Sequence, residues 1–283
     1  MRRTLAILSV SAVVVLAGST PAMAAPSGTG VRNATGYYLA LGDSLAAGYQ
    51  PGTGDDKTGG YVGHVETAIT TTSPKTRLVN LACSGETSTT LVDGGTHCTY
   101  AEGSQLAAAL AFLHAHGQMT RQITIDIGAN DVQGCVSASL AIDLPCVRAG
   151  LTAVSTNLPA TLAALSAAAP NAQILVLNYY NPDLAAWLLG SSGQALAALS
   201  SVLQAQLNGI IAQAAAADGA TLVDIASAFH STDTTPVTVP GLGTVPTNVA
   251  TICALTWMCT LDNIHANDAG YAVMGATTAA RLS

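Results

Sequence analysis

The chain has 283 residues, of which 49% are hydrophobic and only 9% are charged, and its formal net charge is −7 at neutral pH. This length and apolar content are enough for one sizeable core, and no internal repeat or polar linker divides the sequence. An acidic chain with nine lysines and arginines lacks the clustered cations that phosphate binding requires, which argues against a nucleic-acid partner.

The first residues have the pattern of an export signal. Two arginines follow the initial methionine, and the next apolar run, Leu5 to Leu16, is too short to span a bilayer comfortably. Ala22-Met23-Ala24 has the small residues of a cleavage site. An uncleaved anchor helix is the alternative, but the short apolar run and the cleavage pattern favour a signal peptide.

We therefore expect residues 1–24 to be a secretory signal peptide cleaved near Ala24, and residues 25–283 to form a single domain. Removal of the leader would change the formal charge from −7 to −9, since the leader carries two arginines and no acid. No later segment is expected to be long and apolar enough to cross a membrane. The sequence predicts a secreted, soluble protein without a stable membrane anchor.

Six cysteines follow the predicted leader, and an even number in an exported chain indicates disulfides. Fifteen connectivities are open from the sequence alone. Zinc binding is the rival interpretation, and the absence of Cys-x-x-Cys disfavours it. The cysteines fall in three close pairs, so we expect nearest-neighbour bridges: Cys83–Cys98, Cys135–Cys146 and Cys253–Cys259.

Five short apolar runs alternate with alanine-rich segments of helical spacing. Leucines 106, 110 and 113 mark one helix, and seven aliphatic side chains between Leu196 and Ile211, Leu199 and Val202 among them, form one stripe of a longer helix. Alternation of strands and helices predicts an α/β fold with a parallel sheet covered on both faces. The expected strands are Tyr38–Leu41, Arg77–Leu81, Gln122–Ile127, Gln173–Asn178 and Thr221–Ile225.

Two segments near the C-terminus differ in pattern. Asp268–Leu282 is expected to be a closing helix, capped by Asn267 or Asp268. Ser231–Val249 contains three prolines and two glycines with little periodicity, so we expect a long loop. Such a loop either contributes to function or is a surface excursion, and the sequence favours neither.

The most informative run places a serine directly after a predicted strand. Tyr38–Leu41 is followed by Gly42-Asp43-Ser44, and ligands of open α/β sheets bind at the carboxyl ends of strands. A serine hydroxyl is a weak nucleophile that needs a base and a third group to orient that base. Asp262 precedes His265 by three residues, which places both side chains on one face of a helical turn. We therefore predict a triad of Ser44, His265 and Asp262.

Attack on an ester carbonyl also requires donors for the developing oxyanion. Gly85 follows the second predicted strand, where a glycine N–H can approach a substrate closely. Asn130 follows the third and offers a side-chain amide. With the Ser44 backbone N–H, these groups form the predicted oxyanion hole.

Taken together, Gly42-Asp43-Ser44-Leu45, Gly85, Gly128-x-Asn130-Asp131 and Asp262-x-x-His265 resemble the four signature blocks of the SGNH, or GDSL, hydrolase family. The resemblance implies a three-layer α/β/α sandwich with a central five-stranded parallel sheet of flavodoxin-like type, and a serine esterase or lipase that needs no metal or other cofactor. By position it implies that Ser44 is the nucleophile, His265 the base and Asp262 its orienting acid. The exported, cysteine-paired chain is similar to the secreted actinobacterial branch of this family.

Other residues near the blocks have structural interpretations. Asp43 and Asp131 are expected to brace loops through hydrogen bonds. Trp257, inside the proposed Cys253–Cys259 loop, either lines an acyl pocket or anchors that loop. The sequence contains no two histidines with the spacing of metal ligands and no glycine motif for nucleotide binding. The Gly-x-Ser-x-Gly motif is also absent.

The sequence thus predicts a secreted, monomeric serine carboxylic-ester hydrolase acting on a small-molecule, lipid or acylated-carbohydrate ester. A carbohydrate O-acetyl esterase with the same triad is one alternative. A non-catalytic binding module is another, because a fold does not fix a function.

Overall fold

Five short strands form one parallel sheet at the centre of the molecule. The computed structural model describes residues 36–137 and 141–283, so the predicted signal peptide and its cleavage site lie outside the described residues. The strands are β1 (Tyr37–Gly42), β2 (Arg77–Asn80), β3 (Thr120–Asp126), β4 (Gln173–Leu177) and β5 (Thr221–Val223). Their order is β2-β1-β3-β4-β5. This order reverses direction beside β1, and open α/β sheets bind ligands at such a switch point.

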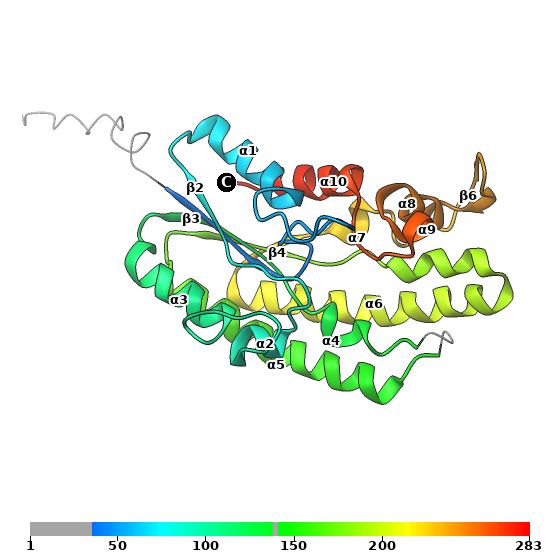
Figure 1. The fold of residues 1–283 in the computed structure, drawn as a ribbon, viewed down its shortest axis with the longest axis horizontal. Helices are drawn as coiled ribbons and strands as arrows, with labels where there is room; N and C mark the ends of the chain where they lie inside the picture. The colour runs from blue at the N-terminus through cyan, green and yellow to red at the C-terminus, as the bar shows by residue number, and fades with distance from the viewer. Residues whose placement is uncertain (1–35, 138–140) are drawn as a thin grey trace, which may run out of the picture. The chain divides into compact units, whose positions relative to one another are not determined.

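Helices cover both faces of this sheet, which confirms the predicted three-layer α/β/α architecture (Figure 1). On one face lie α1 (Gly60–Thr72) and α10 (Asp268–Ala279); on the other lie α3 (Gln105–His116), α5 (Leu144–Ala168) and α6 (Ser191–Asp218). The shorter elements are α2 (Ser88–Asp93), α4 (Asn130–Gln133), the 3-10 helix η2 (Pro182–Leu189), α7 (Ile225–Ala228), α8 (Thr247–Leu255) and α9 (Met258–Leu261).

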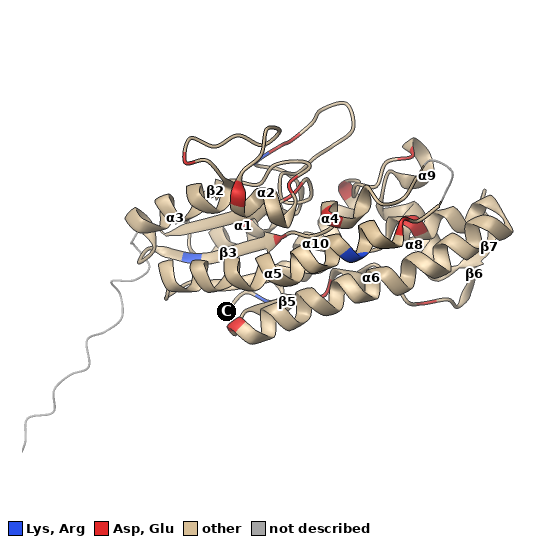
Figure 2. Cartoon of the chain, turned by 90° about the horizontal axis from the view of Figure 1, so that it is seen from below, with Lys and Arg blue, Asp and Glu red and all other residues tan. Residues whose placement is uncertain are grey.

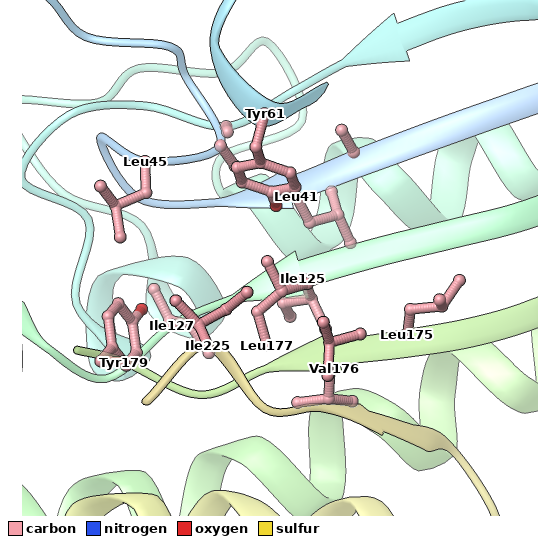
Figure 3. Packing of buried hydrophobic residues seen from close by; sticks show 14 of the residues in the cluster. Leu41, Leu45, Tyr61, Ile125, Ile127, Leu175, Val176, Leu177, Tyr179 and Ile225 are labelled. Carbon is pink, nitrogen blue, oxygen red and sulfur yellow. The ribbon is translucent and has the colours of Figure 1, made fainter. Parts of the chain in front are cut away.

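The strands are buried because both faces of the sheet are covered. From Tyr38 to Leu41, the side chains of β1 are fully buried, and the same is true of Ile123 and Ile125 in β3. Figure 3 shows residues of neighbouring strands packed together at this centre. Burial of each large aliphatic side chain contributes about 1.5–3 kcal/mol, so the core fixes the positions of the strand ends.

Local capping sets where several helices begin. The Ser104 side chain accepts a hydrogen bond from Ala107 N–H at the start of α3, and Thr87 and Thr90 form a capping box on α2. At the start of α10, Asn267 rather than Asp268 is the cap, since its Oδ1 accepts from Gly270 N–H at 3.1 Å. The predicted closing helix is therefore present, with the first of the two proposed caps.

The predicted long loop at Ser231–Val249 is wrong. The segment contains an antiparallel hairpin of β6 (Pro236–Val239) and β7 (Gly243–Pro246), and α8 begins at Thr247. Each strand is four residues long and bounded by proline or glycine, so the alternating pattern is too short to stand out in the sequence. Gly241, with a φ of 84°, permits the tight connection.

Helix α6 differs from the sequence expectation in two ways. Leu199 and Val202 are 41% and 56% exposed, so they flank the buried stripe formed by Leu196, Leu207 and Ile211. By length and composition α6 would also suffice to cross a membrane, contrary to the expectation that no such segment follows the leader. In the structure it packs against α5 and η2 as one helix of the outer layer (Figure 1).

All three predicted disulfides are present: Cys83–Cys98, Cys135–Cys146 and Cys253–Cys259. Each closes a short loop at the end of the molecule that carries the carboxyl ends of the strands.

Candidate active site

Ser44 lies two residues beyond the end of β1, on a turn that is closely packed where it leaves the strand. Gly42, the last residue of β1, has a φ of 132°, and a Cβ there would lie 2.2 Å from two oxygens of Asp126. Only glycine fits this position. The buried amide of Gln105 fixes the same residue, because its Oε1 accepts from Gly42 N–H at 2.6 Å and its Nε2 donates to Gly42 O at 3.0 Å.

Asp43 braces the turn from beneath, as the sequence predicted. Its carboxylate accepts hydrogen bonds from Leu45 N–H at 3.0 Å and from the Tyr179 hydroxyl at 2.7 Å. Leu45 and Tyr179, both labelled in Figure 3, belong to the same buried cluster. Asp131 has the corresponding role after β3, since it accepts from the N–H and the hydroxyl of Ser88 at 2.7 and 2.6 Å.

The structure brings Ser44 and His265 together although 221 residues separate them. The Ser44 Oγ lies 2.8 Å from Nε2 of His265, within hydrogen-bond distance. Ser44 is 7% exposed and His265 is half-buried, so the pair lies at the floor of a hollow.

The other imidazole nitrogen is bound by Asn263. Its Oδ1 lies 2.7 Å from Nδ1 of His265 and accepts from the backbone N–H of His265 at 3.1 Å. The backbone contact identifies the Asn263 atom as the oxygen, so Nδ1 must carry the proton that is donated to it. Nε2 is then unprotonated and faces the serine hydroxyl, which is the tautomer a general base requires.

The predicted Asp262 does not have this role in the structure. Asp262 is exposed, has a left-handed φ of 51°, and its carboxylate makes no hydrogen bond to His265 within the described part of the chain. The left-handed residue ends α9, so the helical turn that the three-residue spacing assumed is interrupted between the two side chains.

Burial determines the charge state of the base. Desolvation lowers the pKa of His265 to about 4, and the negative charge of Asp55 opposes this shift. A histidine with this pKa is neutral at pH 7 and is ready to accept a proton.

Three aromatic residues hold the His265 segment in place. The Tyr180 hydroxyl donates to Ile264 O at 2.8 Å, and the Tyr49 ring lies 4.3 Å from the imidazole, centre to centre. Trp257 donates its backbone N–H to His265 O at 3.0 Å and its indole N–H to Gln50 at 2.6 Å. Of the two interpretations of Trp257, the structure supports the loop anchor.

The three groups predicted as oxyanion donors each have an N–H that is free of a protein acceptor in the described part of the chain. Between residues 36 and 283, outside the undescribed 138–140, no group accepts a hydrogen bond from the backbone N–H of Ser44 or of Gly85. The Asn130 amide donates one N–H to Glu86 O at 2.9 Å, which leaves its second N–H available and holds α4 against the segment containing Gly85. Gly85 has a φ of 83°, which favours glycine.

A hollow of about 450 Å³, its open mouth included, lies directly above the pair. Ser44, His265 and Asn130 all contribute to its wall. Tyr179, Tyr180, Pro182 and Ile264 make the remainder of the wall largely apolar. An ester carbonyl placed in this hollow would meet the hydroxyl, the imidazole and the amide at once.

Two buried carboxyl groups lie beneath the serine turn. Asp126 is fully buried; its Oδ1 accepts from the Tyr61 hydroxyl at 3.1 Å, and its Oδ2 has no partner in the described part of the chain. Burial, with the nearby charge of Asp43, raises the pKa of Asp126 well above its usual range. Burial also raises the pKa of Asp43 to about 6, opposed by its hydrogen bonds. Burial therefore favours the protonated form of Asp126.

Sequence reasoning missed several residues that build this site. Gln105, Asn263, Tyr179 and Tyr180 act through contacts with residues far along the chain or, for Asn263, through a local backbone turn. The pair Tyr179-Tyr180 directly after the fourth predicted strand was an available signal, because side chains there lie at the carboxyl edge of the sheet.

Comparisons with known proteins identify a family and a fold. A model of the GDSL-like Lipase/Acylhydrolase family matches residues 40–273. No curated protein matches the chain. Among solved structures, a lipase from a goat rumen metagenome is similar with a TM-score of 0.57 and 18% identity, covering 88% of this chain and 100% of its own.

Two further structures have the same fold. A GDSL-like lipase from Parabacteroides merdae, which its description calls putative, has a TM-score of 0.54 and 16% identity over 88% of this chain and 97% of its own. A lipase/acylhydrolase from Enterococcus faecalis has a TM-score of 0.51 and 16% identity over 87% of this chain and 94% of its own. At these identities the likeness concerns the fold.

Proposed function

Because the chain belongs to the GDSL-like lipase/acylhydrolase family, we propose that it is a secreted serine hydrolase that cleaves carboxylic esters through an acyl-enzyme on Ser44. The observation that carries this proposal is the 2.8 Å contact between Ser44 Oγ and His265 Nε2, made by an imidazole whose other nitrogen is already held.

The first half of the reaction forms the acyl-enzyme. Ser44 Oγ attacks the carbonyl carbon while Nε2 of His265 takes the hydroxyl proton. The carbonyl oxygen becomes negative and accepts hydrogen bonds from the N–H groups of Ser44, Gly85 and Asn130. The tetrahedral intermediate then collapses, and the alcohol leaves with the proton from His265.

The second half returns the enzyme to its starting state. Water enters the site vacated by the alcohol and gives a proton to Nε2 of His265 as it attacks the acyl carbon. The same N–H groups stabilise the second oxyanion. Ser44 recovers its proton from His265 as the acid is released.

In this mechanism the group that orients His265 is the amide oxygen of Asn263. A neutral acceptor holds the imidazole in the required tautomer without adding a negative charge beside it. This agrees with the lowered pKa of His265, since burial disfavours the imidazolium and the negative charge of Asp55 offsets this only in part.

Export is part of the proposal and has support from two sources. The residue pattern before Ala24 is that of a secretory leader. The three disulfides are typical of proteins that mature in an oxidising compartment.

Active-site labelling tests the proposed function. A fluorophosphonate probe should attach to Ser44 of the wild-type protein, and Ser44→Ala should lose both the label and hydrolysis of p-nitrophenyl butyrate with its thermal unfolding unchanged. Asn130→Ala should keep the label and lose on the order of 10²–10³ in kcat, the usual cost of one oxyanion donor. A wild-type protein that takes no label and hydrolyses no ester would be a binding module.

A further inference from the structure

A second hollow continues from the first. It spans about 450 Å³, open solvent at its mouth included, and it shares the residues Val132, Gln133 and Gln204 with the hollow above Ser44. Its walls come from α4, from Val136 and Ile142, and from α5, η2 and α6. We call it the side groove.

The wall of the side groove is mainly hydrocarbon. Val147 and Leu207 are buried beneath it, and Leu203 is half-buried at its side. The helix that supplies its longest wall is uncharged from Ser191 to Ala217, and Figure 2 shows α6 tan along nearly its whole length. The aliphatic residues that line the groove are Val132, Val136, Ile142, Val147, Leu203 and Leu207.

The chemistry of the reaction determines which part of a substrate enters the groove. His265 protonates the leaving oxygen, so the alcohol lies on the imidazole side of the carbonyl. Neither Ser44 nor His265 lines the side groove. The groove joins the first hollow at Val132 and Gln133, on the side of α4 and Asn130. The portion of the ester bound to the carbonyl carbon therefore points toward the groove.

Resting on the proposed hydrolysis at Ser44, we propose that the side groove is the acyl subsite, and that the substrates are esters of medium-chain aliphatic acids rather than acetyl esters. Removal of apolar chain from water favours such acids, and an acetyl group would leave the groove empty. This assignment separates a lipid-type esterase from a carbohydrate O-acetyl esterase.

One residue of the groove opposes a long hydrocarbon chain. Asp183 contributes to the wall, and its carboxylate has no hydrogen-bond partner among the residues that the structure describes. Burial alone raises its pKa. A chain that covers this group removes water from a carboxylate without replacing the lost hydrogen bonds, which is unfavourable. Asp183 is thus a specificity-determining residue that sets an upper limit on acyl length.

The test is a series of p-nitrophenyl esters with two matched tryptophan variants. Leu203→Trp fills the groove, whereas Leu199→Trp places the same side chain on the exposed face of the same helix. Wild-type kcat/KM should be higher for octanoate than for acetate by about tenfold or more. Leu203→Trp should lower the octanoate-to-acetate ratio of kcat/KM to about one, while Leu199→Trp should keep the wild-type rates for both esters.

A second variant tests the limit on length. Asp183→Asn keeps the size of the side chain and removes its charge, so the dodecanoate-to-acetate ratio of kcat/KM should rise by about threefold or more. A Leu203→Trp protein that fails to fold would lose kcat/KM for acetate and octanoate equally. The Asp183→Asn variant then still probes the groove.

The outcomes separate the two proposals. Suppose that the probe labels Ser44 but that acetate is preferred over octanoate, or that a folded Leu203→Trp protein keeps the wild-type octanoate-to-acetate ratio. Either result overturns the acyl assignment and leaves the ester hydrolase intact. No label and no turnover of any ester overturns the proposed function, and the acyl assignment with it. An unchanged dodecanoate-to-acetate ratio in Asp183→Asn overturns the role of Asp183.

Discussion

Asn263 Oδ1 lies 2.7 Å from Nδ1 of His265, the ring nitrogen that does not face Ser44. The adjacent carboxylate of Asp262 is exposed to solvent instead. An amide therefore occupies the place where serine hydrolases commonly have an acid, and this difference has measurable consequences.

Substitution should distinguish the amide from the acid. Asn263→Ala removes the acceptor for Nδ1 and should lower kcat by on the order of 10², because the imidazole loses its tautomer and orientation. Asp262→Asn should keep kcat within about twofold, since that carboxylate makes no contact with the base. Steady-state rates on p-nitrophenyl butyrate measure both. A large loss in Asp262→Asn with full activity in Asn263→Ala would restore the sequence-based triad.

The same position should control the acid limb of the pH profile. Burial lowers the pKa of His265 to about 4, and only the neutral imidazole accepts the proton of Ser44. The wild-type kcat/KM should therefore hold its plateau as the pH is lowered past 6 and fall only near pH 4. Asn263→Asp adds a negative charge beside Nδ1, favours the imidazolium, and should move the acid limb upward by a unit or more. An acid limb near 6.5 in the wild type would contradict this account.

The buried pair beneath the serine turn should make stability depend on pH. Both Asp43 and Asp126 have raised pKa values, so the folded state binds more protons than the unfolded state above pH 4. Stability should accordingly fall as the pH rises from 4 through about 6. Asp126→Asn replaces a carboxyl whose protonated form is favoured by burial with a neutral amide of the same shape, and removes one acid from the pair.

We expect Asp126→Asn to be more stable than the wild type at pH 8, by on the order of 2 kcal/mol, and to differ little at pH 4. Thermal unfolding measured at both values tests this. A variant destabilised equally at pH 4 and pH 8 would show that the hydrogen bond from Tyr61, and not the charge pair, dominates at this position.

The Cys253–Cys259 bridge should contribute to activity as well as to stability. It encloses Trp257, whose backbone N–H holds His265 O at 3.0 Å. Replacing both cysteines with serine should lower the free energy of unfolding by about 2 kcal/mol, at the small end of the usual range because the loop is short. kcat should also fall when measured well below the unfolding temperature of the variant, since the imidazole is less firmly positioned. Full kcat at that temperature would limit the bridge to a role in stability.

The sequence by itself determined the strands and the helix layers, because these depend on local patterns, and its four motif blocks predicted that Ser44 and His265 form a pair. Short apolar runs between helical stripes are sufficient to predict a parallel sheet, and a serine directly after a buried run must lie at its carboxyl edge. The close spacing of the cysteines was likewise enough to predict their pairing.

Tertiary structure decided the groups that support the catalytic pair. The three-residue spacing of Asp262 and His265 assumed a continuous turn, whereas a left-handed residue interrupts it and turns Asn263 toward the imidazole. Gln105 reaches Gly42 across 63 residues, and the side groove forms only where α4, α5, η2 and α6 meet. Such contacts depend on where separate elements pack, which no local pattern of residues encodes.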